Sequence, residues 1–300
     1  MTVRYGVHGL RRGAMNENPA VSGRFRSFAS RRRRAAGAPA APMSADELIR
    51  IGFATVKNHP VLLKKLTLLR RKATPPREFR TLVKEITFYL GYEATEGLET
   101  VANAVDTPLG PHEGVQLSQK ICVIPILRAG LGMVEPMLDL LPNADVHHIG
   151  MYRNRHSLLP IQYYNKLPRQ ASLCSEVAFV LDPMIAGGAT ISAVVSILKQ
   201  WGAAKIVVIC VVASLPGLAK LQATHPDITV HCGAIDDELT ADGYIFPGLG
   251  DAGDRLFSTP DEDIPVTEPV AVAACATKRA LDGDDSAAAK QKLAKVGDGV

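Results

Sequence analysis

The stretch AFVLDPMIAGGATISAVVSIL, residues 178–198, decides the fold. It begins as an apolar run that ends in Asp182, continues through a turn of small residues, and resumes with apolar residues at helical spacing. A buried strand that leads through a short turn into a helix is the repeating unit of α/β sheets. The remaining question is whether residues 182–190 bind phosphate or only connect a strand to a helix.

Similar apolar runs recur on both sides of this stretch, and helical patterns alternate with them. Runs that are apolar on both faces are typical of the buried strands of a parallel sheet. Alternation with helices favours a doubly wound arrangement with crossover helices. We therefore predict an α/β fold with a mostly parallel sheet flanked by helices. The predicted strands are 121–127, 146–152, 177–182, 205–213 and 227–235, and the predicted helices are 60–72, 76–95, 131–141, 188–201 and 216–224.

The two ends of the chain differ in composition from its middle. Residues 1–45 carry a net charge of +8, residues 261–300 carry −3, and the middle is near −1. We predict a disordered Arg-rich arm over 1–45, one domain over 46–260, and a loosely ordered tail over 261–300 that holds a short helix near 286–295. The nearly neutral middle does not support nucleic-acid binding. The sequence contains no uncharged apolar run of about 18 residues, so we do not expect a membrane span.

The arm and the cysteines bear on the compartment. The arm has three interpretations: a solvated extension, an Arg-rich transit sequence, or a nucleic-acid or nuclear signal at RRRR (31–34). The five cysteines form no CxxC pair and their number is odd, which favours a reducing compartment. We expect a cytoplasmic protein, with organellar targeting by the arm as the alternative.

Charged residues and Gly-rich turns follow several predicted strands. Arg128 comes after 121–127, Arg153 after 146–152, and residues 243–255 follow the last predicted strand. In an open α/β sheet, ligands bind at the carboxyl ends of the strands. Although each turn alone is more often a solvated connection, their shared placement at one edge predicts a site.

The turn at 182–190 has the properties of a phosphate loop. A turn that opens a helix presents unpaired N–H groups, and the helix dipole favours an anion there. Small residues let a phosphate approach the backbone, and the hydroxyl of Thr190 adds a donor. Taken alone, GGAT is a helix entrance at which Gly permits the turn and Thr is the cap. Neither GxxxxGK[ST] nor GxGxxG is present here, which disfavours ATP hydrolysis and NAD binding.

The accompanying residues narrow the ligand. Arginine suits bidentate contact with phosphate, which assigns a diphosphate to Arg128 and Arg153. Asp182 and Asp251 suit hydroxyls or a metal-bound phosphate group. One phosphate at the loop, hydroxyls beside it and a diphosphate at the arginines describe a phosphorylated sugar diphosphate.

Nine motifs follow one another in order over residues 58–260. They are HPVLLKKLTLLR (59–70), EFRTLVKEI (78–86), YEAT (92–95), VIPILRAGLGMV (123–134), HIGMYRN (148–154), YYNKLP (163–168), DPMIAGGAT (182–190), HPDI (225–228) and GYIFPGLGDAGDRLFST (243–259). The most specific motifs lie at the predicted strand ends and in the segment near 250. In these motifs and their order, the chain resembles the uracil phosphoribosyltransferase family, which belongs to the type I phosphoribosyltransferases.

The resemblance implies a glycosyltransferase of pyrimidine salvage, which makes UMP and diphosphate from uracil and 5-phosphoribosyl 1-diphosphate, with Mg²⁺ accompanying the diphosphate. It implies that Arg128 and Arg153 contact the donor and that Asp251 faces it. The substrate-binding residues that it implies are Asp182, Pro183, Met184, Ile185, Ala186, Gly187, Gly188, Ala189 and Thr190 for the ribose 5′-phosphate loop, and Ile245, Gly250, Asp251 and Ala252 for uracil. No metal-ligating residue is assigned. A homodimer or homotetramer and a GTP effector are also implied.

The implied chemistry relies on positioning and charge rather than on a side-chain nucleophile. Backbone groups of the 245–252 segment complement the O2, N3–H and O4 of uracil, and cytosine would leave buried groups unpaired. Asp251 is the candidate base for the N1 proton.

The loop departs from the family pattern, which usually reads DPMLATGGS. Gly187 stands where Thr is usual, Ala189 where Gly is usual, and Thr190 where Ser is usual. The missing Thr hydroxyl removes a phosphate donor, about 1–3 kcal/mol if the bond is to the charged group. Ala189 costs little if its φ is negative. Residues 153–160 also lack the acids that are common there. A catalytically silent uracil- or nucleotide-binding homologue is therefore the alternative function.

Overall fold

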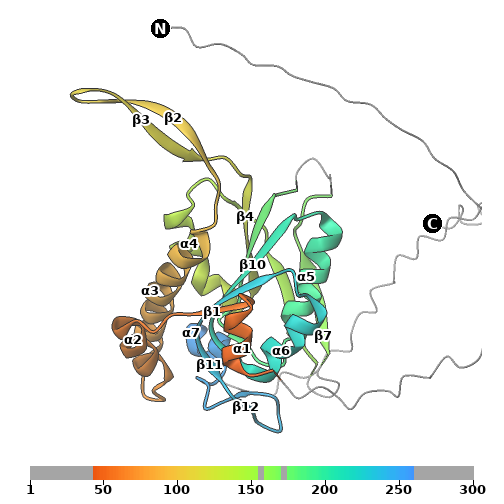
Figure 1. The fold of residues 1–300 in the computed structure, drawn as a ribbon. Coiled ribbons are helices and arrows are strands. Elements are labelled where there is room, and N and C mark those ends of the chain that lie inside the picture. Colours follow the sequence, from red (N-terminus) through yellow and green to blue (C-terminus); the bar gives the residue numbers. More distant parts are fainter. Residues whose placement is uncertain (1–42, 155–158, 170–173, 260–300) are drawn as a thin grey trace, which may run out of the picture.

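The computed structural model describes residues 43–154, 159–169 and 174–259 of the chain, and Figure 1 shows a central sheet with helices on both of its faces. The sheet order is β1-β11-β10-β8-β4-β6-β7, with β5 paired to β4 and β9 paired to β10. All of these pairs are parallel except β6 with β7. The strands are β1 (Ala54–Val56), β4 (Ile121–Leu127), β5 (Asp145–Val146), β6 (Ile149–Arg153), β7 (Pro160–Asn165), β8 (Val177–Leu181), β9 (Met184–Ile185), β10 (Lys205–Ser214) and β11 (Thr229–Asp236). The predicted mostly parallel α/β fold is confirmed.

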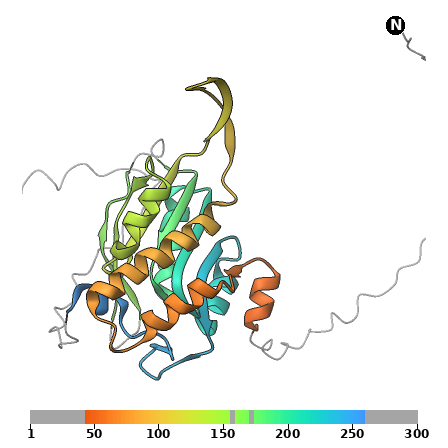
Figure 2. The same cartoon turned by 90° about the vertical axis from the view of Figure 1, so that its left-hand side faces the viewer.

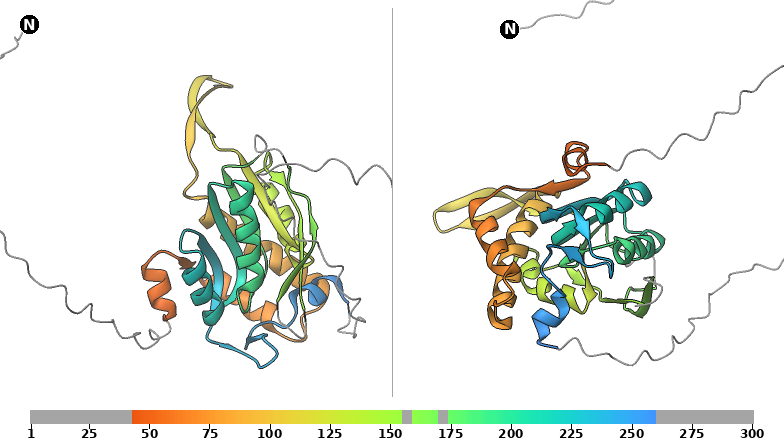
Figure 3. Two further views of the ribbon diagram at one scale, coloured as in Figure 1. Left: turned by 90° about the vertical axis from the view of Figure 1, so that its right-hand side faces the viewer. Right: turned by 90° about the horizontal axis from the view of Figure 1, so that it is seen from below.

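The helices divide between the two faces, as the side view in Figure 2 and the view from below in Figure 3 show. The helices are α1 (Ala45–Arg50), α2 (Pro60–Arg70), α3 (Pro76–Thr95), the 3₁₀ helix η1 (Ala129–Met133), α4 (Val134–Leu140), α5 (Ala189–Trp201), α6 (Leu215–Thr224) and α7 (Ala252–Phe257). One core contains residues of α2, α3, α4 and α7, and the other contains residues of α1, α5 and α6.

The sequence of β8 shows how one strand serves both cores. Val177, Phe179 and Leu181 belong to the core under α3, whereas Ala178 and Val180 belong to the core under α5. All five residues are buried because successive side chains of a strand point to opposite faces and both faces are covered.

The long helix α3 covers most of one face. Its buried residues Phe79, Leu82, Val83, Ile86 and Leu90 recur at intervals of three and four, which places them along one stripe of the helix. This stripe packs on β10, α4 and α7.

Some predicted elements begin or end elsewhere in the structure. The predicted strand 146–152 divides into β5 and β6, and the predicted helix 131–141 starts in η1 and ends at Leu140. The predicted helix near 286–295 and the predicted arm and tail lie outside the described residues, except that α1 begins at Ala45 behind its N-cap Ser44. Within the described ranges, no helix combines the length and the apolarity that crossing a membrane requires.

A hairpin that the sequence analysis did not predict projects from the sheet (Figure 1). Strand β2 (Thr100–Thr107) pairs antiparallel with β3 (Gly110–Leu117), and most of their side chains are exposed. A second short ladder joins β12 (Glu238–Leu239) to β13 (Ile245–Phe246). This ladder lies at the edge of the sheet where the candidate site is found.

Candidate functional site

A cavity of about 400 Å³ joins the two segments that the sequence analysis singled out. One wall is the loop between β9 and α5 together with the first turn of α5, and the other is the segment around β13. The cavity is lined by Met184, Ile185, Ala186, Gly187, Gly188, Ala189, Thr190, Ile191, Lys220, Leu239, Gly243, Tyr244, Ile245, Gly250 and Asp251. We call residues 182–190 the phosphate loop and residues 245–252 the base segment.

Gly188, near the end of the phosphate loop, has a backbone conformation that other residues rarely adopt. Gly188 is the N-cap of α5, with φ of +73°, and no side chain caps the helix. The N–H groups of Ala189, Thr190 and Ile191 therefore lack the side-chain acceptor that a Ser or Asp cap supplies. Thr190 is the second residue of the helix rather than its cap. The helix start is open for an anion, which its dipole favours.

Close packing against α6 fixes the position of the phosphate loop. The hydroxyl of Ser214 donates to the carbonyl oxygen of Ala186 over 2.6 Å. A Cβ on Gly188 would stand 2.7 Å from the carbonyl oxygen of Gly217, and a Cβ on Gly217 would collide with that of Ala186. Because backbone atoms meet on both sides, glycine is required at 188 and 217 alike.

The unusual residues of the phosphate loop are accommodated without strain. A Cβ on Gly187 would meet no atom within 4 Å, so a larger residue fits there. Among the described non-glycine residues only Ser258 has a positive φ, so Ala189 lies in the ordinary region. The replacement of Gly by Ala at 189 is therefore cheap, and the open question concerns the missing hydroxyl at 187.

Asp182, the first residue of the phosphate loop, does not line the cavity. Its Oδ1 accepts a hydrogen bond of 3.3 Å from the N–H of Met184, which closes the turn after β8. The pKa of Asp182 is raised to about 7, mainly because burial desolvates its carboxyl group. The hydrogen bond from the Met184 N–H lowers this pKa, and the negative charge of Asp251 raises it. The charge of Asp251 therefore acts on Asp182.

An ion pair outside the cavity holds the base segment. Asp236, at the end of β11, accepts two hydrogen bonds of 2.7 Å from the guanidinium of Arg70. The same carboxylate accepts the N–H of Gly248 over 3.0 Å, and Arg70 also donates to the carbonyl oxygen of Gly248 over 2.8 Å. Gly248 and Gly250 have φ of +55° and +82°, which glycine adopts at little cost. The segment is thus fixed by charge and shaped by glycine.

Arg255 provides the second anchor of the base segment. Its guanidinium donates to the carbonyl oxygens of Leu249 over 2.6 Å and of Arg71 over 2.7 Å, and it stacks over the ring of Phe79 at 4.3 Å. One side chain of α7 therefore joins the base segment to the α2–α3 turn and to α3.

Asp251 and Arg128 meet at the start of α7. Asp251 is the N-cap of this helix, and its Oδ1 accepts the N–H of Asp254 over 3.0 Å. Arg128 donates to Asp254 over 2.7 Å and to the hydroxyl of Thr259 over 3.1 Å. Arg128 therefore lies next to the Asp251 wall although it does not line the cavity.

The remaining predicted residues lie around this centre. Pro183 is buried in the turn after β8, and Ala252 is the buried first residue of α7. Arg153 is the last residue of β6, and its side chain lies outside the described part of the structure. The cavity thus brings together residues 184–190, Ile245, Gly250 and Asp251, with Asp182, Pro183, Ala252 and Arg128 adjoining.

The predicted site residues did not include five residues of the lining, which are Ile191, Lys220, Leu239, Gly243 and Tyr244. Lys220 is an exposed residue of α6, and an isolated lysine on a helix is normally a solvated surface residue. The feature that connects Lys220 with the site is its position three residues after Gly217, which places it on the side of α6 that meets the phosphate loop.

The site combines an open helix start at the carboxyl edge of a mostly parallel sheet with a second wall of glycine turns and a carboxylate. This combination is typical of α/β proteins that bind phosphorylated sugars or nucleotides. Comparison with known proteins gives the family. The family model described as uracil phosphoribosyltransferase matches residues 56–259, and the chain belongs to this family of pentosyltransferases.

The similar proteins agree with the family model. A uracil phosphoribosyltransferase of Roseiflexus castenholzii is 50% identical over 204 residues, which cover 68% of this chain and 97% of that protein. One from Thermosipho melanesiensis is 46% identical over 205 residues, covering 68% of this chain and 98% of that protein. The solved structure of a protein from Aquifex aeolicus matches with a TM-score of 0.66 and 31% identity, over 70% of this chain and 100% of that one. The resemblance drawn from the motifs is confirmed.

Proposed function

We propose that this chain makes UMP by transferring the 5-phosphoribosyl group of 5-phosphoribosyl 1-diphosphate to N1 of uracil. The observation that carries the proposal is that one cavity joins the phosphate loop to the base segment. Family membership supports the same activity. The cavity volume of about 400 Å³ is within the usual range for small-molecule sites.

In the proposed complex, the 5′-phosphate binds at the start of α5, where the open N–H groups and the helix dipole favour an anion. Asp182 lies next to this position and accepts hydrogen bonds from ribose hydroxyls. Uracil binds against Ile245 and Gly250, which line the cavity, with Ala252 adjoining them. The backbone N–H and C=O groups of Gly250 are accessible because glycine has no side chain.

Arg128 and Arg153 are proposed to bind the diphosphate. A guanidinium has five N–H donors, and among the described residues Arg128 donates from one nitrogen to Asp254 and from another to Thr259. The remaining donors, or those released when the contacts with α7 exchange, are available to phosphate oxygens. Stabilising the leaving group in this way is expected to be the largest catalytic contribution.

The reaction exchanges two bonds at C1′ of the ribose. The C1′–O bond breaks and its electron pair leaves with diphosphate, while N1 of uracil supplies the pair for the new C1′–N1 bond. Asp251 is the proposed acceptor of the N1 proton because it lines the cavity on the uracil side. Replacement of Asp251 by Asn should keep the helix cap, since Asn caps as well as Asp. It should lower kcat about 100-fold, as loss of a general base does; an unchanged kcat would remove Asp251 from this role.

The proposed Mg²⁺ would accompany the diphosphate of the donor. Within the described residues no three His, Cys, Asp or Glu side chains cluster as a metal site. Mg²⁺ usually keeps several waters and binds through substrate phosphates together with one or two carboxylates, and Asp251 is the carboxylate among the described residues that line the cavity. When bound, the ion would neutralise charge on the diphosphate.

A coupled assay tests the proposed activity. The full chain is incubated with uracil, donor and Mg²⁺, and UMP and diphosphate are measured, with cytosine in place of uracil as the control. Equal formation of both products is expected with uracil and little with cytosine. Absence of UMP under saturating substrates would refute the activity.

The second candidate is a catalytically silent homologue that binds uracil or a nucleotide. It is favoured by Gly187, which removes a phosphate donor without filling the space. Calorimetry that detects ligand binding by a protein without turnover would establish it. Turnover that appears in Gly187→Thr would locate the defect in the loop.

The remaining features are also proposed from the family. We propose that residues 46–260 form the catalytic domain between the two extensions, that the chain self-associates as a homodimer or homotetramer, and that GTP is an effector. We propose a cytoplasmic location, with organellar targeting by residues 1–45 as the alternative; the four cysteines of the described residues are free thiols. Sedimentation of the full chain and of a 46–260 fragment, each with and without GTP, tests the first three points.

A further inference from the structure

We propose that Lys220 is a phosphate-binding residue of this enzyme, which supplies a positive charge to the 5′-phosphate of the donor and product. The inference rests on the proposed function and assigns a residue outside the phosphate loop and the base segment. The observation that carries it is that Lys220 lines the same cavity as the start of α5.

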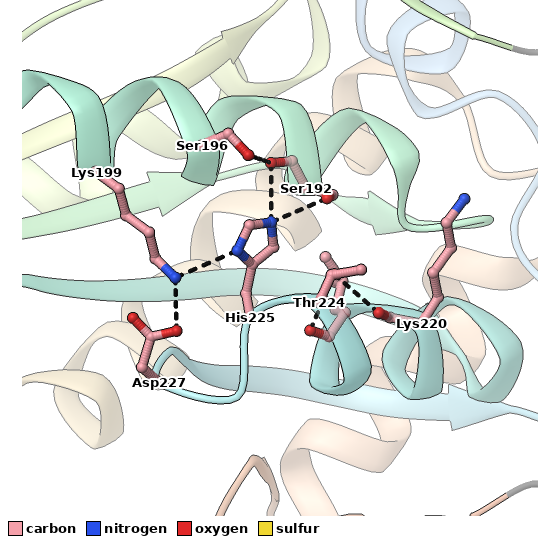
Figure 4. Close-up of polar contacts among 8 residues, drawn as sticks. Ser192, Ser196, Lys199, Lys220, Thr224, His225 and Asp227 are labelled. Atoms are coloured by element: carbon pink, nitrogen blue, oxygen red, sulfur yellow. Dashed lines mark hydrogen bonds and ion pairs between the residues drawn. The ribbon is translucent and has the colours of Figure 1, made fainter.

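The placement of Lys220 follows from the packing of α6. Gly217 and Leu221 are the residues of α6 nearest to Gly188, at 2.7 Å and 3.3 Å from the position of its Cβ. Lys220 lies three residues after Gly217, and residues three apart are neighbours on a helix surface. Figure 4 shows its side chain extending toward the N-terminal end of α5. The contact that fixes the loop therefore also positions the lysine beside it.

A comparison with Lys199 shows that Lys220 has its charge available. The ammonium of Lys199 is bound to Asp227 at 2.5 Å and to Nδ1 of His225 at 3.2 Å, and Nε2 of His225 is bound to the hydroxyl of Ser192. This network runs along α5 from Ser192 to Lys199, and Lys199 lies in the last turn of the helix, at the end away from the loop (Figure 4). In the described part of the chain, the Lys220 ammonium has no hydrogen-bond or ion-pair partner. The carbonyl oxygen of Lys220 accepts a hydrogen bond from the hydroxyl of Thr224.

The electrostatics of the cavity favour a phosphate next to this ammonium. Among the described residues that line the cavity, Lys220 carries the one positive charge and Asp251 the one negative charge. Asp251 belongs to the opposite wall, at the start of α7. Lysine binds phosphate as a flexible point charge, and the open space at Gly187 leaves the anion exposed on the side where family members carry a hydroxyl. Lys220 compensates for that hydroxyl.

The test is titration of the full chain with ribose 5-phosphate by calorimetry, with ribose as the uncharged control. Lys220→Ala should weaken ribose 5-phosphate binding about 5- to 20-fold, the range for a partly screened hydrogen bond to a charged group. Lys220→Arg should keep affinity within about threefold because it retains the charge. Lys64→Ala removes an exposed lysine of α2, outside the cavity, and should leave affinity unchanged.

Steady-state kinetics and a double variant separate a binding role from a structural one. Lys220→Ala should raise the half-saturating donor concentration and leave that of uracil unchanged. The loss should be smaller in a Gly187→Thr background, because the restored hydroxyl takes over part of the contact.

Wild-type affinity for ribose 5-phosphate in Lys220→Ala, or equal losses for donor and uracil, would overturn the inference. The activity itself is judged separately by UMP formation in the unaltered chain. Ribose 5-phosphate binding decides the role of Lys220 even if that assay fails.

Discussion

The two walls of the cavity are held by different physical means. The phosphate loop is fixed by backbone atoms of Gly188, Gly217 and Ala186 that approach one another across two chain segments. The hydroxyl of Ser214 adds a hydrogen bond to Ala186, and no ion pair among the described residues holds this loop. The base segment is fixed from outside by the Arg70–Asp236 pair and by Arg255. The first wall therefore depends on glycines that let backbone segments approach, and the second on charged side chains.

This difference explains what each wall can recognise. An anion is bound by the dipole and N–H groups of a helix start, and only a bare backbone lets it approach closely. A base is distinguished by individual donors and acceptors, whose positions must be exact to a fraction of an ångström. Anchors that stay outside the cavity fix those positions without competing for the ligand. Substitutions should therefore affect the two walls differently.

The largest effect is expected from Gly188→Ala. The alanine would be forced to a φ of +73° and its Cβ would stand 2.7 Å from the carbonyl oxygen of Gly217. We expect a loss of about 3 kcal/mol in the free energy of unfolding and more than about 100-fold in donor affinity, since strain and a backbone clash add. Urea denaturation and donor titration measure the two losses.

Gly187→Ala is the matched control one residue earlier. Its Cβ meets no atom within 4 Å and its φ is not positive, so stability should be unchanged. If both variants behave alike, close backbone packing is not what fixes this wall.

The next effect is expected from Asp236→Asn, which breaks the anchor of the base segment. The side chain of Arg70 is 23% exposed and that of Asp236 is 8% exposed, so the pair is partly buried. Loss of one partner should cost about 2 kcal/mol of stability, less than for a fully buried pair. The half-saturating concentration of uracil should rise more than that of the donor in steady-state kinetics.

Lys84→Ala serves as the control for removing a charge. Its ion pair with Glu135 joins two exposed side chains and should contribute little. An equal rise in donor and uracil half-saturation in Asp236→Asn would show that the two walls are not held independently.

A smaller effect is expected on the pH dependence of the free energy of unfolding, through Asp182 and Asp251. The pKa of Asp182 is raised to about 7, so the folded state binds this proton more tightly than the unfolded state. The stabilisation is complete below the unfolded pKa of about 4 and is lost as pH rises through about 7. Between pH 6 and 8 the wild type should lose on the order of 1–2 kcal/mol more than Asp182→Asn, as measured by urea denaturation at both pH values.

Asp251→Asn tests the coupling itself. It removes a charge that raises the pKa of Asp182, so the pH midpoint of this loss should move downward. An unchanged midpoint would mean that desolvation alone sets the pKa of Asp182.

The smallest effect is a gain from Gly187→Thr. The position is open, so the side chain fits and its hydroxyl becomes available to the 5′-phosphate. Donor affinity should improve about fivefold, which corresponds to about 1 kcal/mol for a partly exposed hydrogen bond. Gly187→Val, with similar shape and no hydroxyl, should give no gain; equal gains would indicate a packing effect.

The main fold was predictable because the deciding signals are local. Runs such as 177–181 and 206–213 are apolar at every position, which is the pattern of strands covered on both faces. The position of the phosphate loop followed from the strand end at Leu181. The hairpin at 100–117 was not predictable from polarity, because both of its faces are exposed and no alternation of apolar residues marks it.

The candidate site was predictable in its motifs but not in its long-range contacts. The residues of DPMIAGGAT were placed from the sequence, whereas Lys220 joins them only because α6 packs on Gly188. The pairing of Arg70 with Asp236 spans 166 positions, and no local pattern announces it. The sequence predicted that Arg128 contacts phosphate. It did not predict the hydrogen bonds of Arg128 to Asp254 and Thr259, because these form only where α7 approaches.

The meeting of Gly188 with Gly217 has a thermodynamic consequence. A loop held in place by backbone contacts has little conformational freedom left to lose, so ribose 5-phosphate binding should carry only a small ordering entropy. Because the loop is preorganised, binding costs little free energy for ordering it, and the affinity at this wall is set by the contacts with the ligand. Calorimetry over a range of temperatures should therefore find a small heat-capacity change for ribose 5-phosphate, far below that of a binding site that orders on contact.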